Sequence, residues 1–384
     1  MKVDIYENKS INDIVRLNFF YNEEKDDKYL WELLNGVIDV ALKNNLNLQK
    51  ELLKNYEATI KLDRKSFGNK NLMYIQIENL NKNFTRDGED ITLDCAKILF
   101  DFVCNIKKYL ETVTLKQYYS LVKGCNKIFE KTKDSLYSFL YTNTKSKEIA
   151  LNNITLEKVK EYANRIFNNS SLYLQMITNK KVADEILNSI DFKSLEKNEI
   201  NKEKVSFANL DFYDVYNEEK SKKLATEIDF IMQRKNLELN SEIFTKNQLL
   251  AKVISLLVFD VVREENSLSY NPSSCFNINY NFMYIRANFH ESNKFKVETL
   301  IAKCIKDIEN GDFNEKLLDY AKIQLGDLYN LENYKINKKS LNDAINELYE
   351  FNFDLELMKT LTKQDIINHL KTFKIKLIYY LGGR

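Results

Sequence analysis

Histidine is almost absent from this sequence, and glycine and proline are rare. The 384 residues include two histidines, eight glycines and one proline. A catalytic zinc site takes about three protein ligands and a water molecule, and no set of carboxylates and cysteines here has a spacing that would replace the missing histidines. The sequence also lacks a glycine-rich phosphate-binding loop and a G-x-S-x-G nucleophile elbow. These absences argue against a metalloenzyme acting alone, a nucleotide-binding enzyme and a serine hydrolase.

Long apolar runs and an excess of charge of one sign are missing as well. No stretch of about 18 apolar residues occurs, so no transmembrane helix is predicted, and residues 1–6 lack the apolar core of a signal peptide. The 57 basic and 56 acidic residues give a net charge of +1, which offers no case for binding nucleic acid or an anionic membrane. Five cysteines form no C-x-x-C pair, so no disulfide framework is expected. The sequence therefore predicts a cytoplasmic protein.

The order of predicted strands and helices occurs twice along the chain. The first half is predicted to contain strands at 2–6, 14–20, 58–63, 72–77 and 172–177, and helices at 26–44, 48–56, 92–110, 115–141 and after Thr155. The second half is predicted to contain strands at 224–232, 276–280, 282–289 and 375–381, and helices at 245–262, 294–308, 314–330, 340–350 and after Thr362. Each half therefore places strands and helices in a similar order.

Residues 191–222 are rich in lysine, glutamate, asparagine and serine and are predicted to be a linker. Apolar residues make up 44% of the chain, which is enough for a core on each side of that linker. We therefore predict an α+β fold with two homologous domains, 1–190 and 223–384, each with a sheet in one layer and helices in the other.

A helix that ends in arginine is the most distinctive feature of the second half. Residues 249–262 are apolar on nearly every side, so this helix should be buried all round. Arg263 and Tyr270 follow it, and Asn266 and Ser267 between them favour a break in the helix. A buried helix followed by a short loop can direct both side chains into one cavity, where a guanidinium and a phenol suit a peptide carbonyl or an oxyanion. Alternatively, Arg263 extends to water or pairs with a neighbouring glutamate.

This segment resembles the arginine/tyrosine motif of the insulinase-type (M16, inverted zincin) peptidases. The family pattern, Arg-Glu-x-x-x-Leu-x-Tyr after a buried helix, is filled here by Arg263, Glu264, Leu268 and Tyr270, and Ser267 stands where glycine is usual. The resemblance implies that each domain is a mostly antiparallel sheet with helices on one face, and that the chain corresponds to one half of a clamshell. It also implies that Arg263 and Tyr270 contact a substrate beside a zinc ion held by the other half.

The zinc motif of active family members has no counterpart in this chain. Those members carry His-x-x-Glu-His on the first long helix, where two histidines bind zinc and the glutamate activates water. The corresponding residues here, 30–39, present an aliphatic face. His290 is expected at a strand end, and His369 in a helical pair with Asp365. Cys275 and His290 could formally form a nucleophile pair, but Cys275 is expected to be packed. We therefore predict no catalytic residue, metal ligand or cofactor in this chain.

The resemblance implies the zinc-less subunit of a heterodimeric M16-type metallopeptidase. Such a chain is inactive alone and positions a peptide for cleavage at the zinc of a partner that carries His-x-x-Glu-His. The short length and the missing zinc motif are similar to accessory members of bacteriocin and modified-peptide pathways, which makes a leader peptide the expected substrate. The alternative is a non-catalytic peptide-binding or scaffold protein of the same fold without a peptidase partner. A third interpretation, an independent enzyme with another metal, would require stoichiometric zinc and activity without a partner.

Overall fold

Two compact units make up the computed structural model of this chain. It describes residues 1–8, 10–22, 24, 27–132, 151–195, 198, 205–207, 209–210, 215–220, 225–348 and 351–382. Unit 1 comprises Met1–Phe129, Glu148–Glu203 and Tyr334–Leu348, and unit 2 comprises Glu130–Lys147, Lys204–Asn333 and Tyr349–Arg384. Among the described residues, no helix is long and apolar enough to cross a membrane. The cytoplasmic location stays a prediction.

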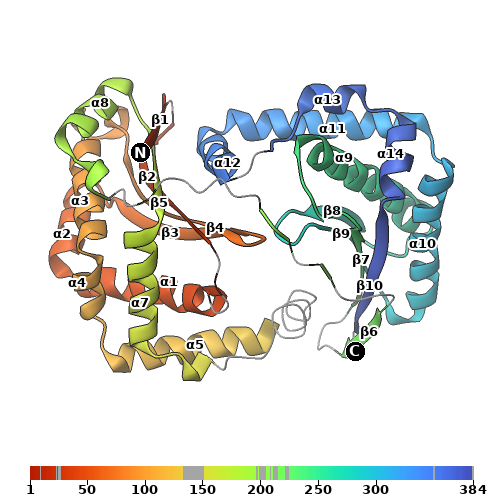
Figure 1. Ribbon diagram of the computed structural model, residues 1–384, viewed down its shortest axis with the longest axis horizontal. Coiled ribbons are helices and arrows are strands. Elements are labelled where there is room, and N and C mark those ends of the chain that lie inside the picture. Colours follow the sequence, from red (N-terminus) through yellow and green to blue (C-terminus); the bar gives the residue numbers. More distant parts are fainter. Residues whose placement is uncertain are drawn as a thin grey trace. The chain divides into compact units, whose positions relative to one another are not determined.

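Unit 1 contains a five-stranded sheet, sheet A, with the strand order β1-β5-β2-β4-β3 (Figure 1). Its strands are β1 (Lys2–Tyr6), β2 (Asn12–Asn22), β3 (Thr59–Phe67), β4 (Lys70–Leu80) and β5 (Ser171–Ile177). The helices of this half of the sequence are α1 (Asp27–Asn44), α2 (Leu46–Lys54), α3 (Thr92–Cys104), α4 (Ile106–Glu111), α5 (Leu115–Thr132), α7 (Leu156–Asn169) and α8 (Lys180–Ser189). Only β1 and β5 pair in parallel within sheet A; the other neighbouring strands are antiparallel.

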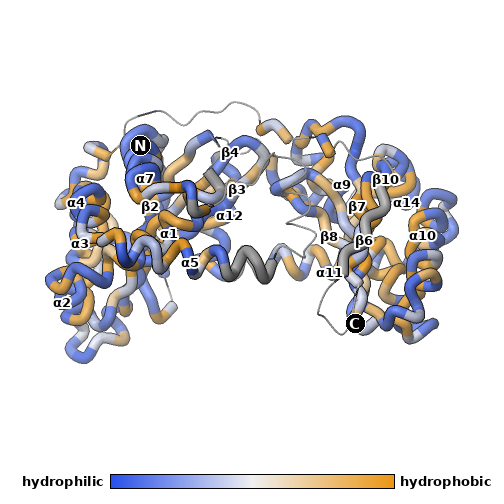
Figure 2. Tube along the Cα trace, turned by 90° about the horizontal axis from the view of Figure 1, so that it is seen from below, coloured by the Kyte–Doolittle hydropathy of each residue, from blue (hydrophilic) through white to orange (hydrophobic). Residues whose placement is uncertain are grey.

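The core of unit 1 lies between sheet A and a layer of helices. Alternate residues of a strand point to the same face of its sheet, and residues three or four apart share one face of a helix. On this rule β2 contributes Val15, Leu17 and Phe19, and α7 contributes Val159, Ala163 and Ile166, all at most 1% exposed. Phe19 meets Phe167 edge-on, with ring centroids 5.1 Å apart. Hydrophobic and hydrophilic residues alternate along the helices in Figure 2, and burial of the apolar faces is the main term that stabilises such a layer.

Unit 2 repeats this plan in sheet B, whose strand order is β6-β10-β7-β9-β8. Its strands are β6 (Val215–Lys220), β7 (Thr226–Arg234), β8 (Ser273–Asn277), β9 (Phe282–Phe289) and β10 (Phe373–Gly382). The main helices are α9 (Ser241–Val258), α10 (Lys294–Asn310), α11 (Glu315–Tyr334), α13 (Leu355–Thr360) and α14 (Lys363–Leu370). β6 is parallel to β10 and the other pairs are antiparallel. Each strand occupies the same place as its counterpart in sheet A, so the predicted α+β fold with two similar domains is confirmed.

The two threonines that were predicted to start helices both do so. The Thr155 hydroxyl accepts from the Lys158 N–H at 3.3 Å ahead of α7. Thr362 forms a capping box ahead of α14, in which the Asp365 carboxylate accepts from the Thr362 N–H at 2.8 Å.

Strand β6 was not predicted. It lies inside the stretch assigned to a linker, and its sequence, VYNEEK, is polar over its second half.

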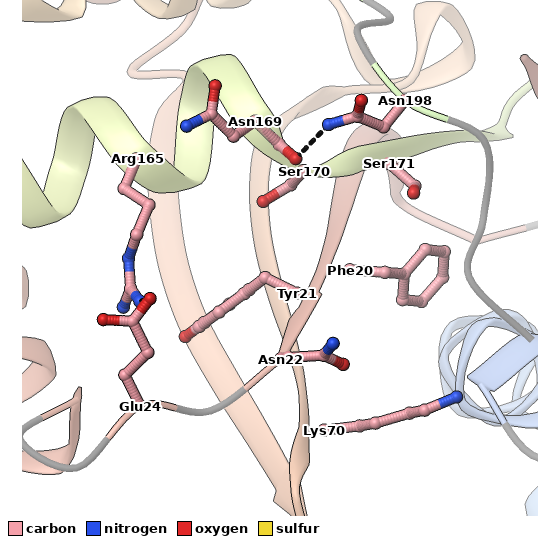
Figure 3. A pocket seen from close by; sticks show the side chains of 10 residues that line it. All are labelled: Phe20, Tyr21, Asn22, Glu24, Lys70, Arg165, Asn169, Ser170, Ser171 and Asn198. Atoms are coloured by element: carbon pink, nitrogen blue, oxygen red, sulfur yellow. Dashed lines mark hydrogen bonds and ion pairs between the residues drawn. The ribbon is translucent and has the colours of Figure 1, made fainter. Parts of the chain in front are cut away.

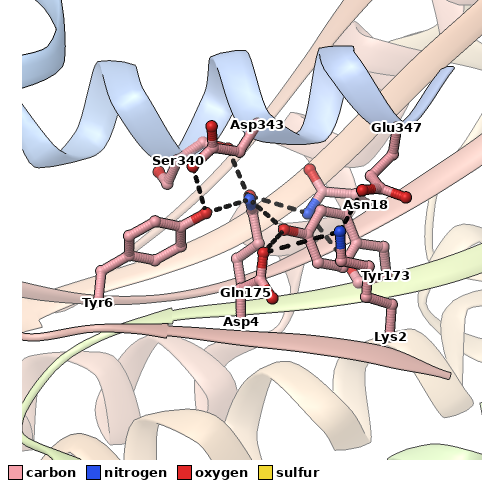
Figure 4. Close-up of polar contacts among 9 residues, drawn as sticks. All are labelled: Lys2, Asp4, Tyr6, Asn18, Tyr173, Gln175, Ser340, Asp343 and Glu347. Carbon is pink, nitrogen blue, oxygen red and sulfur yellow. Dashed lines mark hydrogen bonds and ion pairs between the residues drawn. The ribbon is translucent and has the colours of Figure 1, made fainter. Parts of the chain in front are cut away.

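Helix α12 (Ile336–Leu348) comes from the second half of the sequence but belongs to unit 1. It contacts β4 and β5 on the face of sheet A turned away from the other helices (Figure 4). Its contacts with the sheet are largely polar: Tyr6 donates to Asp343 at 2.8 Å, Gln175 donates to the Ser340 carbonyl at 2.5 Å, and Lys2 pairs with Glu347. This helix therefore covers a polar sheet face, whereas the opposite face is apolar.

Arg16 lies at the centre of the contact between sheet A and α12. The residue is 2% exposed. Its guanidinium donates to Gln76 at 2.7 Å, to the Ser340 hydroxyl at 3.0 Å, to Gln175 at 3.3 Å and to Asn337. In the described part of the chain no carboxylate forms an ion pair with it, and burial lowers the pKa of Arg16. Among the described residues the hydrogen bonds of Arg16 go to neutral oxygens, and its guanidinium carbon also lies 5.0 Å from the Tyr74 ring centroid. Because the charge is buried, each of those hydrogen bonds is costly to lose.

Candidate functional site

The predicted arginine helix is present, and it ends in a wider turn. Helix α9 begins at Ser241 after Asn240, whose side chain accepts from the Ile243 N–H at 2.8 Å. It continues into a π-helical segment, η4 (Phe259–Glu265). Such segments leave the regular hydrogen-bond ladder of a helix and often occur at functional sites. The expectation that this helix is buried all round was too strong, because Leu256 and Leu257 are only partly buried. The face of α9 that carries Leu256 and Leu257 is therefore partly exposed to solvent.

The chain turns sharply after η4. The Ser267 N–H donates to the Arg263 carbonyl at 2.8 Å, and the Leu268 N–H donates to the Val262 carbonyl at 3.0 Å. Ser267 adopts a left-handed conformation with φ of 54°, which costs a residue with a side chain more than it costs glycine. This strained position is the one where the resembling motif has glycine. The turn brings Tyr270 back beside the end of the helix.

The Arg263 guanidinium lies over two aromatic rings. Its central carbon is 4.8 Å from the centroid of the Phe259 ring and 5.0 Å from that of Tyr270. The Nε atom is 3.3 Å from the Glu264 carboxylate, and the Arg263 side chain is 37% exposed. Within the described residues, no acceptor bonds the terminal nitrogens of Arg263 and no group bonds the Tyr270 hydroxyl. The two predicted site residues therefore lie together and keep donors available for a ligand.

A pocket of about 560 Å³ contains both side chains. Its lining is Arg263, Glu264, Ser267, Leu268, Ser269, Tyr270, Asn288 and Phe289. The Ser269 hydroxyl in this lining is buried and makes no hydrogen bond. Tyr270 is 83% exposed at the rim. A planar guanidinium with free terminal donors beside a free phenol suits a carbonyl or carboxylate oxygen. Asn288 and Ser269 are polar groups of this pocket that the sequence pattern did not point to.

A second cavity, of about 440 Å³, lies at the end of sheet A (Figure 3). It is lined by Phe20, Tyr21, Asn22, Glu24, Lys70, Arg165, Asn169, Ser170, Ser171 and Asn198. Glu24 supplies the only carboxylate of this lining, and it pairs with Arg165. Histidine and cysteine are absent from the lining, so this cavity offers no ligand set for zinc.

The helix that matches the family's zinc helix is part of the apolar core. Leu33, Leu34, Val37 and Ala41 of α1 are each 0% exposed. The described residues contain no group of three or more histidine, cysteine, aspartate or glutamate side chains that could hold a metal ion. The described residues therefore offer no ligand set for the zinc ion that active family members bind.

The two histidines have structural contacts. His290 is exposed at the end of β9, as predicted, and its ring accepts from the Ser292 N–H at 3.4 Å. His369 does not form the expected pair with Asp365, because Asp365 binds Thr362. Instead, the buried His369 contacts the Asn247 side chain at 2.8 Å. Cys275 was expected to be packed, but the structure leaves this residue exposed. Its thiol donates to the Phe276 carbonyl at 3.6 Å, and partial desolvation raises the pKa of the thiol. Cys275 and His290 are thus engaged separately and do not form a nucleophile pair.

His369 predicts a specific acid sensitivity of unit 2. Burial, with smaller effects of the Arg234 and Lys246 charges, lowers the pKa of His369 to about 3. The unfolded chain takes up this proton near pH 6.5 and the folded chain does not, so stability is lost as pH falls below that value. Between pH 7.5 and 5 we expect the wild type to lose about 2 kcal/mol through this residue. The measurement is the free energy of unfolding in urea at both pH values. His369→Gln should no longer lose stability between them, whereas the exposed control His290→Gln should lose as much as the wild type. Equal losses in all three proteins would contradict the assignment to His369.

Comparisons with known proteins match this chain to a family model and to solved structures of similar fold. Residues 149–325 match the family model described as the peptidase M16 inactive domain. A conserved protein from Enterococcus faecalis V583 superposes with a TM-score of 0.78 at 15% identity, covering 100% of this chain and 96% of that protein. A putative M16-like peptidase from Alicyclobacillus acidocaldarius gives 0.72 at 10% identity, again with 100% and 96% coverage. A peptidase M16 inactive domain from Pseudomonas fluorescens gives 0.68 at 13% identity, with the same coverage.

No curated protein matches the chain. At these identities the structural comparisons assign the fold, which is that of M16-like peptidases over the full length of the chain. The matched residues, 149–325, begin ahead of α7, include the whole segment that carries Arg263 and Tyr270, and end within α11. Both observations agree with the resemblance drawn from the Arg263–Tyr270 segment.

Proposed function

We propose that this chain is the zinc-less subunit of a two-chain M16-type metallopeptidase of the cytoplasm. Arg263 and Tyr270 bind and orient a peptide, and the partner subunit, an M16 homologue with His-x-x-Glu-His, cleaves that peptide at its zinc. The substrate class is a leader peptide of a modified peptide or bacteriocin. The observation that carries the proposal is the pair of unoccupied donors, on Arg263 and Tyr270, in one pocket of an M16-like fold.

The chain's own residues support binding and orientation. The Arg263 terminal nitrogens can donate to a peptide carbonyl in the plane of the guanidinium. The Tyr270 hydroxyl, seven residues later, can donate to a second oxygen of the same peptide. Donors fixed in place before the substrate arrives contribute to rate through positioning and through stabilisation of developing negative charge. Zinc in the partner would supply the activated water.

The test is to co-express this chain with a His-x-x-Glu-His homologue from the same genome and to purify the complex. We expect the two chains to co-purify and to cleave a leader peptide together, whereas neither chain cleaves it alone. Equal cleavage by the homologue with and without this chain would contradict the proposal. Purification of this chain with a bound peptide but without the homologue would favour the alternative, a peptide-binding or scaffold protein of the M16 fold without a peptidase partner.

A further inference from the structure

Phe259 forms the part of the Arg263 environment that the arginine/tyrosine pattern does not include. Phe259 and Arg263 are four residues apart on η4, a spacing that places two side chains on one face of a helical turn. The Arg263 guanidinium carbon is 4.8 Å from the Phe259 ring centroid, closer than its 5.0 Å to Tyr270. The two rings differ in setting, since Tyr270 is 83% exposed on the loop and Phe259 is partly buried on the helix. Phe259 is therefore the more firmly held of the two.

A ring over a guanidinium restricts where that side chain can point. Arginine has several rotatable bonds, and among the described residues the only ionic contact of Arg263 is to the neighbouring Glu264, whose side chain is 58% exposed. Such an exposed pair gives little orientation. Contact between an aromatic face and the guanidinium plane is attractive and leaves the in-plane donors open. The ring of Phe259 thus limits the guanidinium to positions from which its terminal nitrogens still reach a ligand.

We infer that Phe259 is a positioning residue that fixes the Arg263 guanidinium for the bound peptide, a role that rests on the function proposed above. Removing the ring leaves Arg263 in place but free to move, and misplacement of a positioning group lowers turnover by up to about 10²-fold. We expect Phe259→Leu to lower kcat of the paired enzyme about tenfold with a smaller change in KM. Phe259→Tyr keeps the ring and is expected to retain wild-type kinetics.

A double-mutant cycle separates positioning from loss of structure. If Phe259 acts through Arg263, then Phe259→Leu lowers turnover in the wild-type background and has no further effect in Arg263→Ala. A loss of the same size in both backgrounds would show a general structural role and overturn the inference. Wild-type turnover of Phe259→Leu, alongside an impaired Arg263→Ala, would overturn it as well.

A spectroscopic measurement on the isolated chain makes the inference independent of the partner. The chain has eight arginines, so the Nε–H signal of Arg263 can be assigned by comparison with Arg263→Lys. Ring currents from Phe259 displace this signal, and we expect Phe259→Leu to shift it and Phe259→Tyr to leave it close to wild type. An unshifted signal in Phe259→Leu would overturn the inference. Unimpaired turnover of Arg263→Ala would overturn the proposed function instead, and a shifted signal would then still assign the orientation of Arg263 to Phe259.

Discussion

Arg263→Ala is expected to lower kcat/KM of the paired enzyme by about 10²- to 10³-fold, the usual cost of removing one fixed donor from a reacting centre. The terminal nitrogens of Arg263 contact no protein acceptor among the described residues, so their donors are available to the substrate. Arg263→Lys keeps the charge but loses the planar fork, and we expect it to recover only part of the rate. The measurement is single-turnover cleavage of a labelled leader peptide by the purified two-chain complex.

The matched control is Lys303→Ala, which changes an exposed cation on α10. It should leave turnover unchanged. Stability of Arg263→Ala should stay within about 0.5 kcal/mol of wild type, because the one ionic contact of Arg263 within the described part of the chain is partly exposed. An Arg263→Ala complex that turns over at the wild-type rate would show that this side chain does not contact the reacting peptide, and the trans-acting role would be abandoned.

Arg16→Ala is expected to destabilise unit 1 by about 3 kcal/mol, since it leaves several buried acceptors without a donor. Gln76, Gln175 and Ser340 would each lose a hydrogen bond that they make with Arg16. Because Ser340 lies on α12, the change should also loosen this helix from sheet A. Hydrogen exchange followed by mass spectrometry should show faster exchange in α12 and β2, and chemical denaturation should show the lower stability.

The surface pair Lys43–Asp39 provides the control for that experiment. Both side chains are more than half exposed, at 69% and 59%, and such pairs contribute at most about 1 kcal/mol. Lys43→Ala should therefore leave the exchange of α12 unchanged. If Arg16→Ala exchanges like the wild type in α12, the polar contacts of Arg16 do not hold this helix on the sheet.

The elements that could be predicted from sequence are those whose signals are local. Thr155 and Thr362 precede apolar patterns with helical spacing, and a hydroxyl that caps a helix acts within three residues of itself. Strand β2 alternates the core residues Val15, Leu17 and Phe19 with other residues, the period of a strand with one apolar face. The repeated order of predicted strands and helices was the basis for predicting two similar domains. These features depend on neighbours in the sequence, which is why periodicity detects them.

The features that escaped prediction depend on partners far away in the chain. A helix at 340–350 was predicted, but its packing on sheet A was not, because the side of α12 that contacts the sheet is polar. Its partner Arg16 precedes Ser340 by 324 residues. The contact of His369 with Asn247 spans 122 residues. At the candidate site the pattern pointed to Arg263 and Tyr270. The π-helical turn that places Phe259 beside them has no sequence signature of its own.

Residues 334–348 lie in the second half of the sequence but are part of unit 1. The folding of the first half therefore depends on a segment of the second. A polypeptide that ended near residue 203 would expose the polar face of sheet A and hydrate Arg16, and the remaining piece would carry α12 with nothing to cover. Neither repeat is therefore a self-sufficient module, and exchanging one of them between related genes would have to bring along a matching segment of the other.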